Sequence, residues 1–341
     1  MALNPLYVQA ELPTTSQAAI REFNERYLAA IGASQPSGWA DDLGDLIPVN
    51  SPMTTFPVSQ LRTLYKRTEA EGRFKTLLEK SFDVKVEEFD DGYQARLMDL
   101  FLKIFAYRKW QEAPSRLVLA EEQFRHSQIA ALLLAGTTTT CVDGQNFFST
   151  AHPANMVDSS VAGTWSNYQS TAADFTDPMT GITSLQTECV NMSSGVMDEN
   201  GQPLGARADT ILCPLDVEEP LNNLLAKNLI LAQGTGSSAN VAVGAVSNPY
   251  IGRFKVIGVK EWPLTSGTTR DSFLIDSKLI KLASPWMSAR LTVPGSLALR
   301  TYDESSDYFK DTGNIKVGSH IWYGFSLVLP HAIRRVKGTT R

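Results

Sequence analysis

The chain has 341 residues, of which 43% are hydrophobic and 20% are charged, and its formal net charge at pH 7 is −5. A chain of this length can bury a substantial core and divide into two or more domains. The negative charge excludes a globally basic field that would recruit nucleic acid. No basic segment followed by an apolar one opens the chain, and no window approaches eighteen continuous apolar residues, so neither a secretory signal nor a spanning helix is predicted.

The three cysteines, Cys141, Cys189 and Cys213, are odd in number and widely separated. They form no C-x-x-C pair, so neither a zinc knuckle nor a disulfide framework is supported. We expect buried or partly buried free thiols.

Residues 1–52 have the character of an arm. A helix is predicted over 15–31, and one stripe of it carries apolar side chains, namely Ile20, Phe23, Tyr27, Leu28 and Ile31. The prolines and acidic residues that follow cannot bury enough surface to fold alone, so we expect this part to lie along another surface. Its predicted anchors are Trp39, Leu43, Leu46 and Ile47, and we expect Trp39 and Leu43 to contact a neighbouring subunit. A flexible leader is the alternative.

Residues 53–92 combine charge with a strand signal. Residues 82–87 alternate apolar and charged side chains, as a strand with one solvated face does. Both signs of charge surround Gly72, on Arg67, Glu69, Glu71, Arg73 and Lys75. The pattern predicts a two-stranded projection with a charged tip, and an isolated hairpin needs a partner surface. We therefore expect these five residues to contact another subunit, the alternative being a solvated loop.

Residues 94–135 carry the strongest helical signal. Apolar residues recur at helical spacing, namely Leu97, Leu100, Phe101, Ile104 and Phe105. Pro114 is predicted to begin a second helix that ends at Gly136. The predicted inward face of that helix consists of Leu117, Ala120, Phe124, Ala131 and Ala135.

The second half of the chain is rich in strands. A helix is predicted from Asp177, its N-cap, with Pro178 in the first turn. After a turn at 198–205 come a strand over 210–213, a helix from Asp216 and further strands over 241–246, 251–259, 272–275, 290–293, 296–301 and 321–329. Strands grouped after helices, without regular βαβ alternation, predict an α+β fold.

The segment 141–153 joins the long helix to this second half. Asp143 and Gly144 form a tight-turn pair, Phe147 and Phe148 follow as apolar anchors, and His152-Pro153 closes the segment. We expect both phenylalanine rings to be buried.

Ser149 and His152 raise the alternative of a hydrolase. A nucleophilic serine would sit on a glycine elbow such as G-x-S-x-G, which is missing around Ser149. A metal site from Cys141, His152, Cys189 and Cys213 matches no known ligand spacing. We therefore predict no catalytic, metal or cofactor site.

Two blocks of sequence resemble the Mu-like major head subunit family of tailed phages. One is Cys141-Val-Asp-Gly-Gln-Asn-Phe-Phe-Ser-Thr-Ala-His-Pro153. The other is Asp198-Glu-Asn-Gly-Gln-Pro-Leu-Gly205 followed by Ala208-Asp-Thr-Ile-Leu-Cys-Pro214. Their order and spacing are similar to the family's, and the resemblance extends over about residues 40–340.

The resemblance implies the tailed-phage capsid fold of the Hong Kong 97 type. Carried onto this sequence, it gives an N-arm (1–52), an extended loop (53–92), a peripheral domain with a long spine helix (93–199 and 317–341) and an axial domain (200–316). It implies a virion protein, made in the host bacterial cytoplasm, whose activity is assembly into pentamers and hexamers of an icosahedral shell. A tail-tube or minor head protein is the alternative within the virion.

The implied partners are further copies of the chain, a portal, a maturation protease, non-specific packaged double-stranded DNA and, as an additional candidate, a decoration protein. No membrane is involved. Because the sequence starts directly with the arm, scaffolding is expected from a separate protein. We expect no covalent cross-linking between subunits, although Lys66, Lys75 and Lys80 offer lysines.

Overall fold

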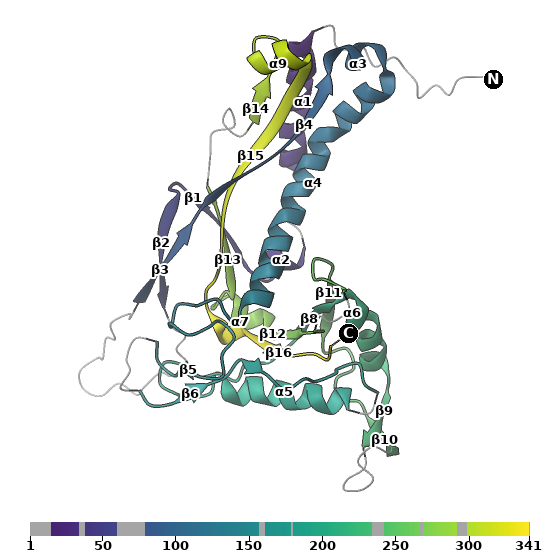
Figure 1. Cartoon of the computed structure of the whole chain (residues 1–341). Coiled ribbons are helices and arrows are strands. Elements are labelled where there is room, and N and C mark those ends of the chain that lie inside the picture. The colour runs from purple at the N-terminus through teal and green to yellow at the C-terminus, as the bar shows by residue number, and fades with distance from the viewer. Residues whose placement is uncertain are drawn as a thin grey trace, which may run out of the picture.

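A computed structural model describes residues 15–33, 38–59, 79–156, 161–178, 180–233, 242–265, 269–291 and 299–340. It has a tall upper part around the helix α4 (Ile104–Ala135) and a broad lower part that rests on α5 (Gly181–Gly195) (Figure 1). The combination of helices with mixed sheets confirms the predicted α+β class.

The upper part is built on one long strand, β15 (Asn314–Leu327). β4 (Glu87–Arg96) pairs with it antiparallel over ten residues. On the other side, β15 pairs with β13 (Trp286–Leu291) and β14 (Leu299–Tyr302), and β13 pairs in parallel with β1 (Asp45–Val49). The sequence predicted this last strand from residue 321 only, because residues 314–320 mix polar and apolar side chains.

Helix α1 (Ser16–Ala33) packs along α4 and confirms the predicted N-terminal helix. Ile20, Phe23 and Tyr27 are buried in a cluster with Leu117 of α4. Leu28 is 59% exposed and was wrongly predicted on this stripe. It follows Tyr27 directly, so about 100° of helical turn carries it off the contact face.

The helix break occurs at a different residue from the one predicted. α3 (Leu97–Leu102) ends at Lys103, whose backbone is extended, and α4 then runs through Pro114 without interruption. Packing holds α4 together across the proline: Trp110 is buried against α1, and its indole N–H donates to the main-chain oxygen of Ala19 at 3.1 Å.

The inward face of α4 also differs from the prediction. The break at Lys103 resets the helical phase, so Phe105 is 71% exposed. Farther along, Ala131 and Ala135 are exposed, while Ile129 and Leu133 are buried. Apolar residues surround much of this helix, so periodicity alone did not identify the contact face.

The lower part contains a five-stranded sheet in the order β11-β8-β12-β16-β7. Its strands span Lys255–Val259, Thr210–Pro214, Ser272–Ile275, Ile333–Val336 and Tyr168–Gln169, respectively. Ile211 and Leu274 face α5 and α6 (Leu215–Ala226), while Leu212 and Phe273 face the end of α4. The sheet is therefore buried on both faces, which explains the continuous apolar run at 210–213.

Both helices on the lower face have the predicted apolar stripes. α5 buries Ile182, Leu185, Cys189 and Met192, and α6 buries Val217, Leu221, Leu224 and Leu225. α5 begins at Gly181, four residues after the predicted cap. Asp177 still accepts hydrogen bonds from the main-chain N–H groups of Thr180 and Gly181.

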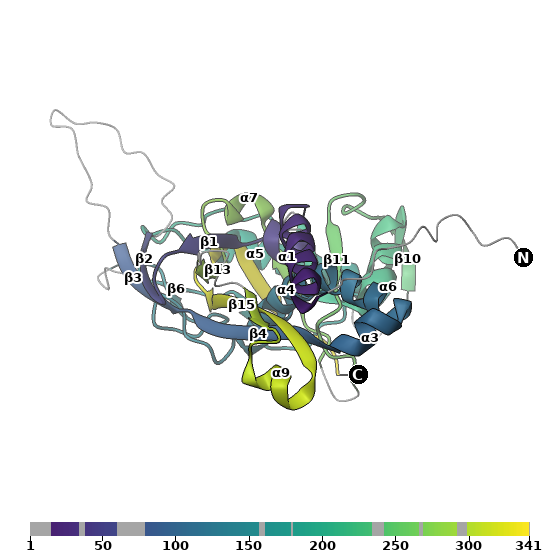
Figure 2. The ribbon, with the colours of Figure 1, turned by 90° about the horizontal axis from the view of Figure 1, so that it is seen from above.

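Two hairpins lie on opposite sides of the molecule when it is seen from above (Figure 2). One consists of β2 (Met53–Ser59) and β3 (Glu79–Lys85), the other of β9 (Leu229–Gln233) and β10 (Ala242–Ser247). The remaining short elements are α2 (Trp39–Asp42), β5 (His152–Pro153), β6 (Thr164–Trp165), α7 (Ser277–Ile280), α9 (Asp307–Thr312) and the 3-10 turn η3 (Pro330–Ala332).

The predicted domain limits stay a prediction, and the packing of the chain crosses them at three elements. α5 lies within the range 93–199 and β16 within 317–341, yet both pack in the lower part with β8. β4 begins inside the predicted extended loop and pairs with β15. Within the described ranges, no helix is long and apolar enough to cross a membrane.

Candidate functional site

The hairpin of β2 and β3 is the predicted projection. Seven residue pairs join its strands, from Met53 opposite Lys85 to Ser59 opposite Glu79. Val58, Val84 and Val86 are buried at its base, whereas the alternate residues Asp83 and Lys85 are exposed. The charged tip lies outside the described residues, and with it Arg67, Glu69, Glu71, Arg73 and Lys75.

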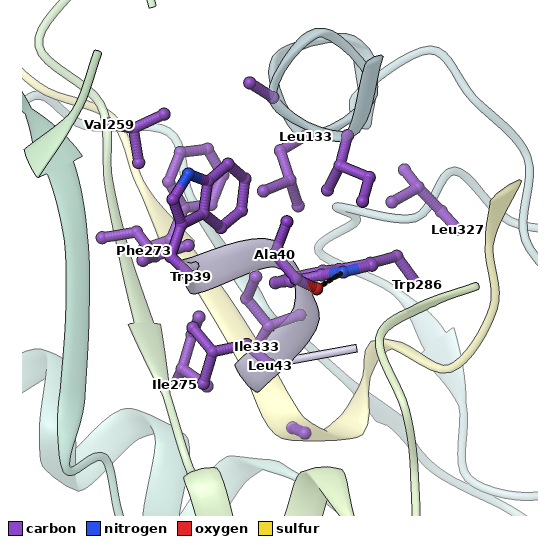
Figure 3. Packing of buried hydrophobic residues seen from close by; sticks show 14 of the residues in the cluster. Trp39, Ala40, Leu43, Leu133, Val259, Phe273, Ile275, Trp286, Leu327 and Ile333 are labelled. Atoms are coloured by element: carbon purple, nitrogen blue, oxygen red, sulfur yellow. Dashed lines mark hydrogen bonds between the residues drawn. The ribbon is translucent and has the colours of Figure 1, made fainter. Parts of the chain in front are cut away.

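Trp39 and Leu43 lie in the core of their own chain (Figure 3). They belong to α2 and the turn after it, and their side chains are 8% and 5% exposed. Trp286 packs edge-on against Trp39 and donates its indole N–H to the main-chain oxygen of Ala40 at 3.0 Å. These two anchors therefore fix the arm onto its own subunit, in contrast to the predicted role as contacts between subunits. Leu46 and Ile47 are half-buried in β1.

The segment 141–153 turns the chain back from the end of α4. Gly144 has φ of 86°, and its N–H donates to the main-chain oxygen of Cys141 at 3.0 Å. Asp143 accepts a hydrogen bond from the main-chain N–H of Gln145 at 2.8 Å. The Asp-Gly pair thus forms the predicted tight turn, with glycine at the left-handed position.

Phe147 and Phe148 are buried, with 0% and 2% exposure, as expected. Phe148 packs against Phe273 of the lower sheet and donates its N–H to the main-chain oxygen of Gly136 at 2.8 Å. A Cβ at Gly136 would lie 2.6 Å from the Phe148 ring, and Gly136 itself has an ordinary helical φ of −62°. Gly136 therefore serves close packing at the helix end.

His152 is the centre of a buried polar cluster. Its Nδ1 lies 2.6 Å from Asp143 Oδ2 and its Nε2 lies 3.0 Å from Asn167 Oδ1. Asn167 donates its amide to the carbonyl of Phe147, and this bond orients Oδ1 towards the imidazole. Both ring nitrogens thus face side-chain oxygens, and the imidazole is held between Asp143 and Asn167.

Burial opposes ionisation of Asp143, but its neighbours outweigh that effect. The hydrogen bond and charge of His152, together with bonds from the Cys141 thiol and the Gln145 main chain, lower the pKa of Asp143 below its usual value. The ion pair therefore holds the turn to His152, which lies nine residues further along the chain.

Ser149 and His152 do not form a nucleophile–base pair. Both nitrogens of His152 are occupied by Asp143 and Asn167. The Ser149 hydroxyl oxygen accepts a hydrogen bond from the main-chain N–H of Ala151 at 3.1 Å. This geometry supports a structural role for the segment.

Cys141 joins the same cluster, and its ligand-type atom lies within 4.8 Å of those of Asp143 and His152. The thiol donates to Asp143 Oδ1 at 3.0 Å, and burial, with the nearby carboxylate, raises the pKa of Cys141. The thiol of Cys141 and the imidazole of His152 therefore both bind the carboxylate of Asp143. Cys189 and Cys213 are buried elsewhere, in the hydrophobic cluster that α5 and α6 form with the lower sheet. The sequence interpretation placed Asp143 in the tight turn but missed its contacts with Cys141 and His152.

Two buried ion pairs tie the last strand to the helices, and sequence reasoning found neither. Arg334 donates to Glu188 of α5 at 2.7 Å. Arg335 donates its Nε to Asp271 at 2.9 Å and its Nη1 to the main-chain oxygen of Leu134 at 2.7 Å. Arg335 thereby caps the C-terminal end of α4, where the helix dipole favours a cation. The basic run at the end of the chain was the available signal.

His331 is buried near His152. Within the described part of the chain, neither of its ring nitrogens makes a hydrogen bond. It is 1% exposed and packs on Trp165, with ring centroids 4.8 Å apart. Burial, followed by the charge of His152, lowers the pKa of His331 to about 3. The ring is therefore neutral in the folded chain.

This neutrality predicts a pH dependence of stability. Between about pH 6.5 and 3, the unfolded chain binds a proton at His331 that the folded chain does not, so stability falls as the pH falls. Within this pH range, the difference of one bound proton changes the folding equilibrium constant by up to about tenfold per pH unit. Denaturant titrations at pH 5 and pH 8 measure the unfolding free energy at each pH. The difference between the two values should be smaller in His331→Phe than in the wild type. An unchanged difference in the variant would contradict the assignment.

Comparison with known proteins relates this architecture to viral heads. Residues 76–178, which include β3, β4, α4 and the 141–153 turn, match the family model of the Mu-like prophage major head subunit gpT. No curated protein sequence matches the chain significantly. Among solved structures, the procapsid of bacteriophage JBD30 aligns with 99% of this chain and 77% of its own, at 13% identity and a TM-score of 0.54. The chain has the tailed-phage major capsid fold.

Other capsid structures align at lower scores. The capsid of cyanophage P-SCSP1u covers 89% of this chain and 90% of its own at 11% identity and a TM-score of 0.48. The capsid of the native GTA particle covers 89% and 92% at 11% identity and a TM-score of 0.46.

Proposed function

We propose that this chain is the major capsid protein of a tailed phage. Its copies assemble as pentamers and hexamers of a closed icosahedral shell that encloses a double-stranded DNA genome. The observation that carries this proposal is the joint match: the capsid fold extends over 99% of the chain, and the Mu-like head subunit model matches the segment containing the spine helix.

The shape of the molecule supports assembly. The hairpin of β2 and β3 extends from one side of the molecule, and such a two-stranded projection gains stability from a partner surface (Figure 2). The opposite hairpin, of β9 and β10, extends from the other side. A subunit with projections on two sides can contact two neighbours, as closed rings of identical subunits require.

The charged tip of the extended loop is the proposed contact with a neighbouring subunit. Residues 60–78 contain five Lys or Arg and two Glu, so the tip is basic although the chain is acidic. One surface ion pair contributes little, but the same pairs recur in every copy of a shell. Arg67, Glu69, Glu71, Arg73 and Lys75 are the proposed contact residues.

Reversing three of these charges should block assembly without unfolding the chain. In the variant Arg67→Glu, Arg73→Glu, Lys75→Glu, we expect an unchanged melting temperature and a yield of closed particles at least about tenfold lower, because attraction becomes repulsion at every contact. Sedimentation velocity measures the yield. The charge-preserving variant Arg67→Lys, Arg73→Lys, Lys75→Arg is the control. Normal assembly of the reversed variant would refute the contact.

The remaining partners follow from the proposed role. A head shell works with a portal, a separate scaffolding protein, a maturation protease and packaged DNA, and a decoration protein is a further candidate. The test is co-expression with a scaffolding protein followed by electron microscopy. Closed shells would support the proposal, whereas helical tubes would favour a tail-tube protein and monomers alone would argue against both.

A further inference from the structure

A pocket of about 720 Å³ lies between α5, the loop before β8 and the start of α7. It is separate from the hairpins and from the 141–153 turn. Its lining includes three basic residues with exposed positions, Arg207, Arg253 and Lys278. It also includes the carboxylates of Asp209 and Asp276.

The two carboxylates hold main-chain groups. Asp276 caps α7 by accepting the N–H groups of Lys278 and Leu279, each at 3.0 Å, and it also accepts the N–H of Arg207 at 2.7 Å. Asp209 accepts the N–H of Ser277 at 3.1 Å and its hydroxyl at 2.6 Å. Both carboxylates therefore accept hydrogen bonds from groups of the pocket wall.

The three basic side chains have no carboxylate oxygen within 4.0 Å in the described residues. Some basic side chains elsewhere on the lower part do have one: Arg270 pairs with Asp216 at 3.0 Å and Lys255 lies 3.6 Å from Asp42. A protein with a net charge of −5 thus gathers three unpaired cations around one pocket. Such an arrangement binds anions.

Arg253 is also held in place. Its guanidinium lies 5.1 Å from the centre of the Tyr250 ring and 5.2 Å from that of Phe254. One N–H of Arg253, on Nη2, donates to the main-chain oxygen of Ala208 at 3.5 Å, and the guanidinium has further N–H groups whose planar arrangement matches the geometry of a phosphate. The pocket therefore presents a pre-oriented arginine beside two exposed cationic side chains, those of Arg207 and Lys278.

We propose that this pocket binds phosphate groups of the double-stranded DNA enclosed in the head. The proposal rests on the proposed capsid function, because DNA is the polyanion that a head contains. A volume of about 720 Å³ exceeds one phosphate and suits a stretch of backbone. Binding through Arg and Lys to phosphates is independent of sequence, as packaging of a whole genome requires.

The test measures binding of a labelled 30-base-pair duplex to the unassembled full chain at several salt concentrations. The variant Arg207→Gln, Arg253→Gln, Lys278→Gln removes three cations. Since each neutralised phosphate contributes about −0.9 to the slope of log K against log salt, the variant's slope should be shallower by about two to three. The control, Lys109→Gln, Lys227→Gln, Lys316→Gln, removes the same charge from exposed positions elsewhere and should leave the slope nearly unchanged.

Two further experiments distinguish DNA binding at this pocket from binding of an acidic protein and from an effect on assembly. Polyglutamate of matched charge should compete poorly with the duplex, and efficient competition that depends on the three cations would instead identify an acidic protein as the ligand. Shell formation by the triple variant is scored by microscopy: normal shells with weakened DNA binding support the pocket assignment. Equal slopes for the triple and control variants would overturn it, whether or not shells form.

Discussion

Replacing Asp271 with leucine should destabilise the chain by about 3–5 kcal/mol, because it leaves Arg335 buried without its partner. Arg335 is 8% and Asp271 2% exposed, so water cannot replace the lost carboxylate. The effect should extend to the end of α4, since the same guanidinium donates to the main-chain oxygen of Leu134. Denaturant unfolding followed by tryptophan fluorescence measures the loss.

A double-mutant cycle tests the cause. Adding Arg335→Met to Asp271→Leu removes the unpaired charge, so the double variant should recover a large part of the lost stability. Recovery will be incomplete, because Arg335 also caps α4 and Asp271 also accepts the N–H of Gly338 at 3.0 Å. As a control, Glu112→Leu breaks the exposed pair with Arg116 and should change stability by about 0.5 kcal/mol or less. If the double variant were no more stable than Asp271→Leu alone, the ion pair would not be the cause.

Asp143→Ala should destabilise the chain by a similar amount, about 3–5 kcal/mol, because it breaks the buried contact between Asp143 Oδ2 and His152 Nδ1. The Cys141 thiol and the main-chain N–H of Gln145 would also lose their acceptor. Ser149→Ala removes one acceptor and should cost about 1 kcal/mol or less. If the segment 141–153 has a structural role, Asp143→Ala should therefore lower stability more than Ser149→Ala does.

The Asp143 effect should depend on pH with a definite sign. Its pKa is lowered in the folded chain, so its ionised form contributes stability above about pH 3.8, and that contribution is lost as the pH falls through the folded-state value. The difference in unfolding free energy between the wild type and Asp143→Asn should therefore narrow below pH 3.8. A difference that is constant from pH 7 to pH 3 would show that Asp143 is not held as the carboxylate.

The sequence predicted elements whose signal is local. The stripe on α5, the stripe on α6 and the apolar run at 210–213 were found because burial on a fixed face imposes a period on the sequence. The turn at Asp143-Gly144 and the burial of Phe147 and Phe148 were found for the same local reason.

Long-range packing decided the features that the sequence did not reveal. Pro114 continues a helix because α1, about ninety residues away in sequence, holds the helix on both sides of it. Trp39 lies in its own subunit's core because β13, which carries Trp286, is paired with β1 next to it. Arg334 and Arg335 find partners on other elements, and residue spacing contains no information about such pairs.

A cryo-electron microscopy reconstruction of the particles formed by this chain tests the capsid assignment most directly. We predict a closed icosahedral shell of pentamers and hexamers, in which the hairpin of β2 and β3 from each subunit lies on a neighbouring subunit. A helical tube, or particles in which this hairpin contacts only its own subunit, would contradict it.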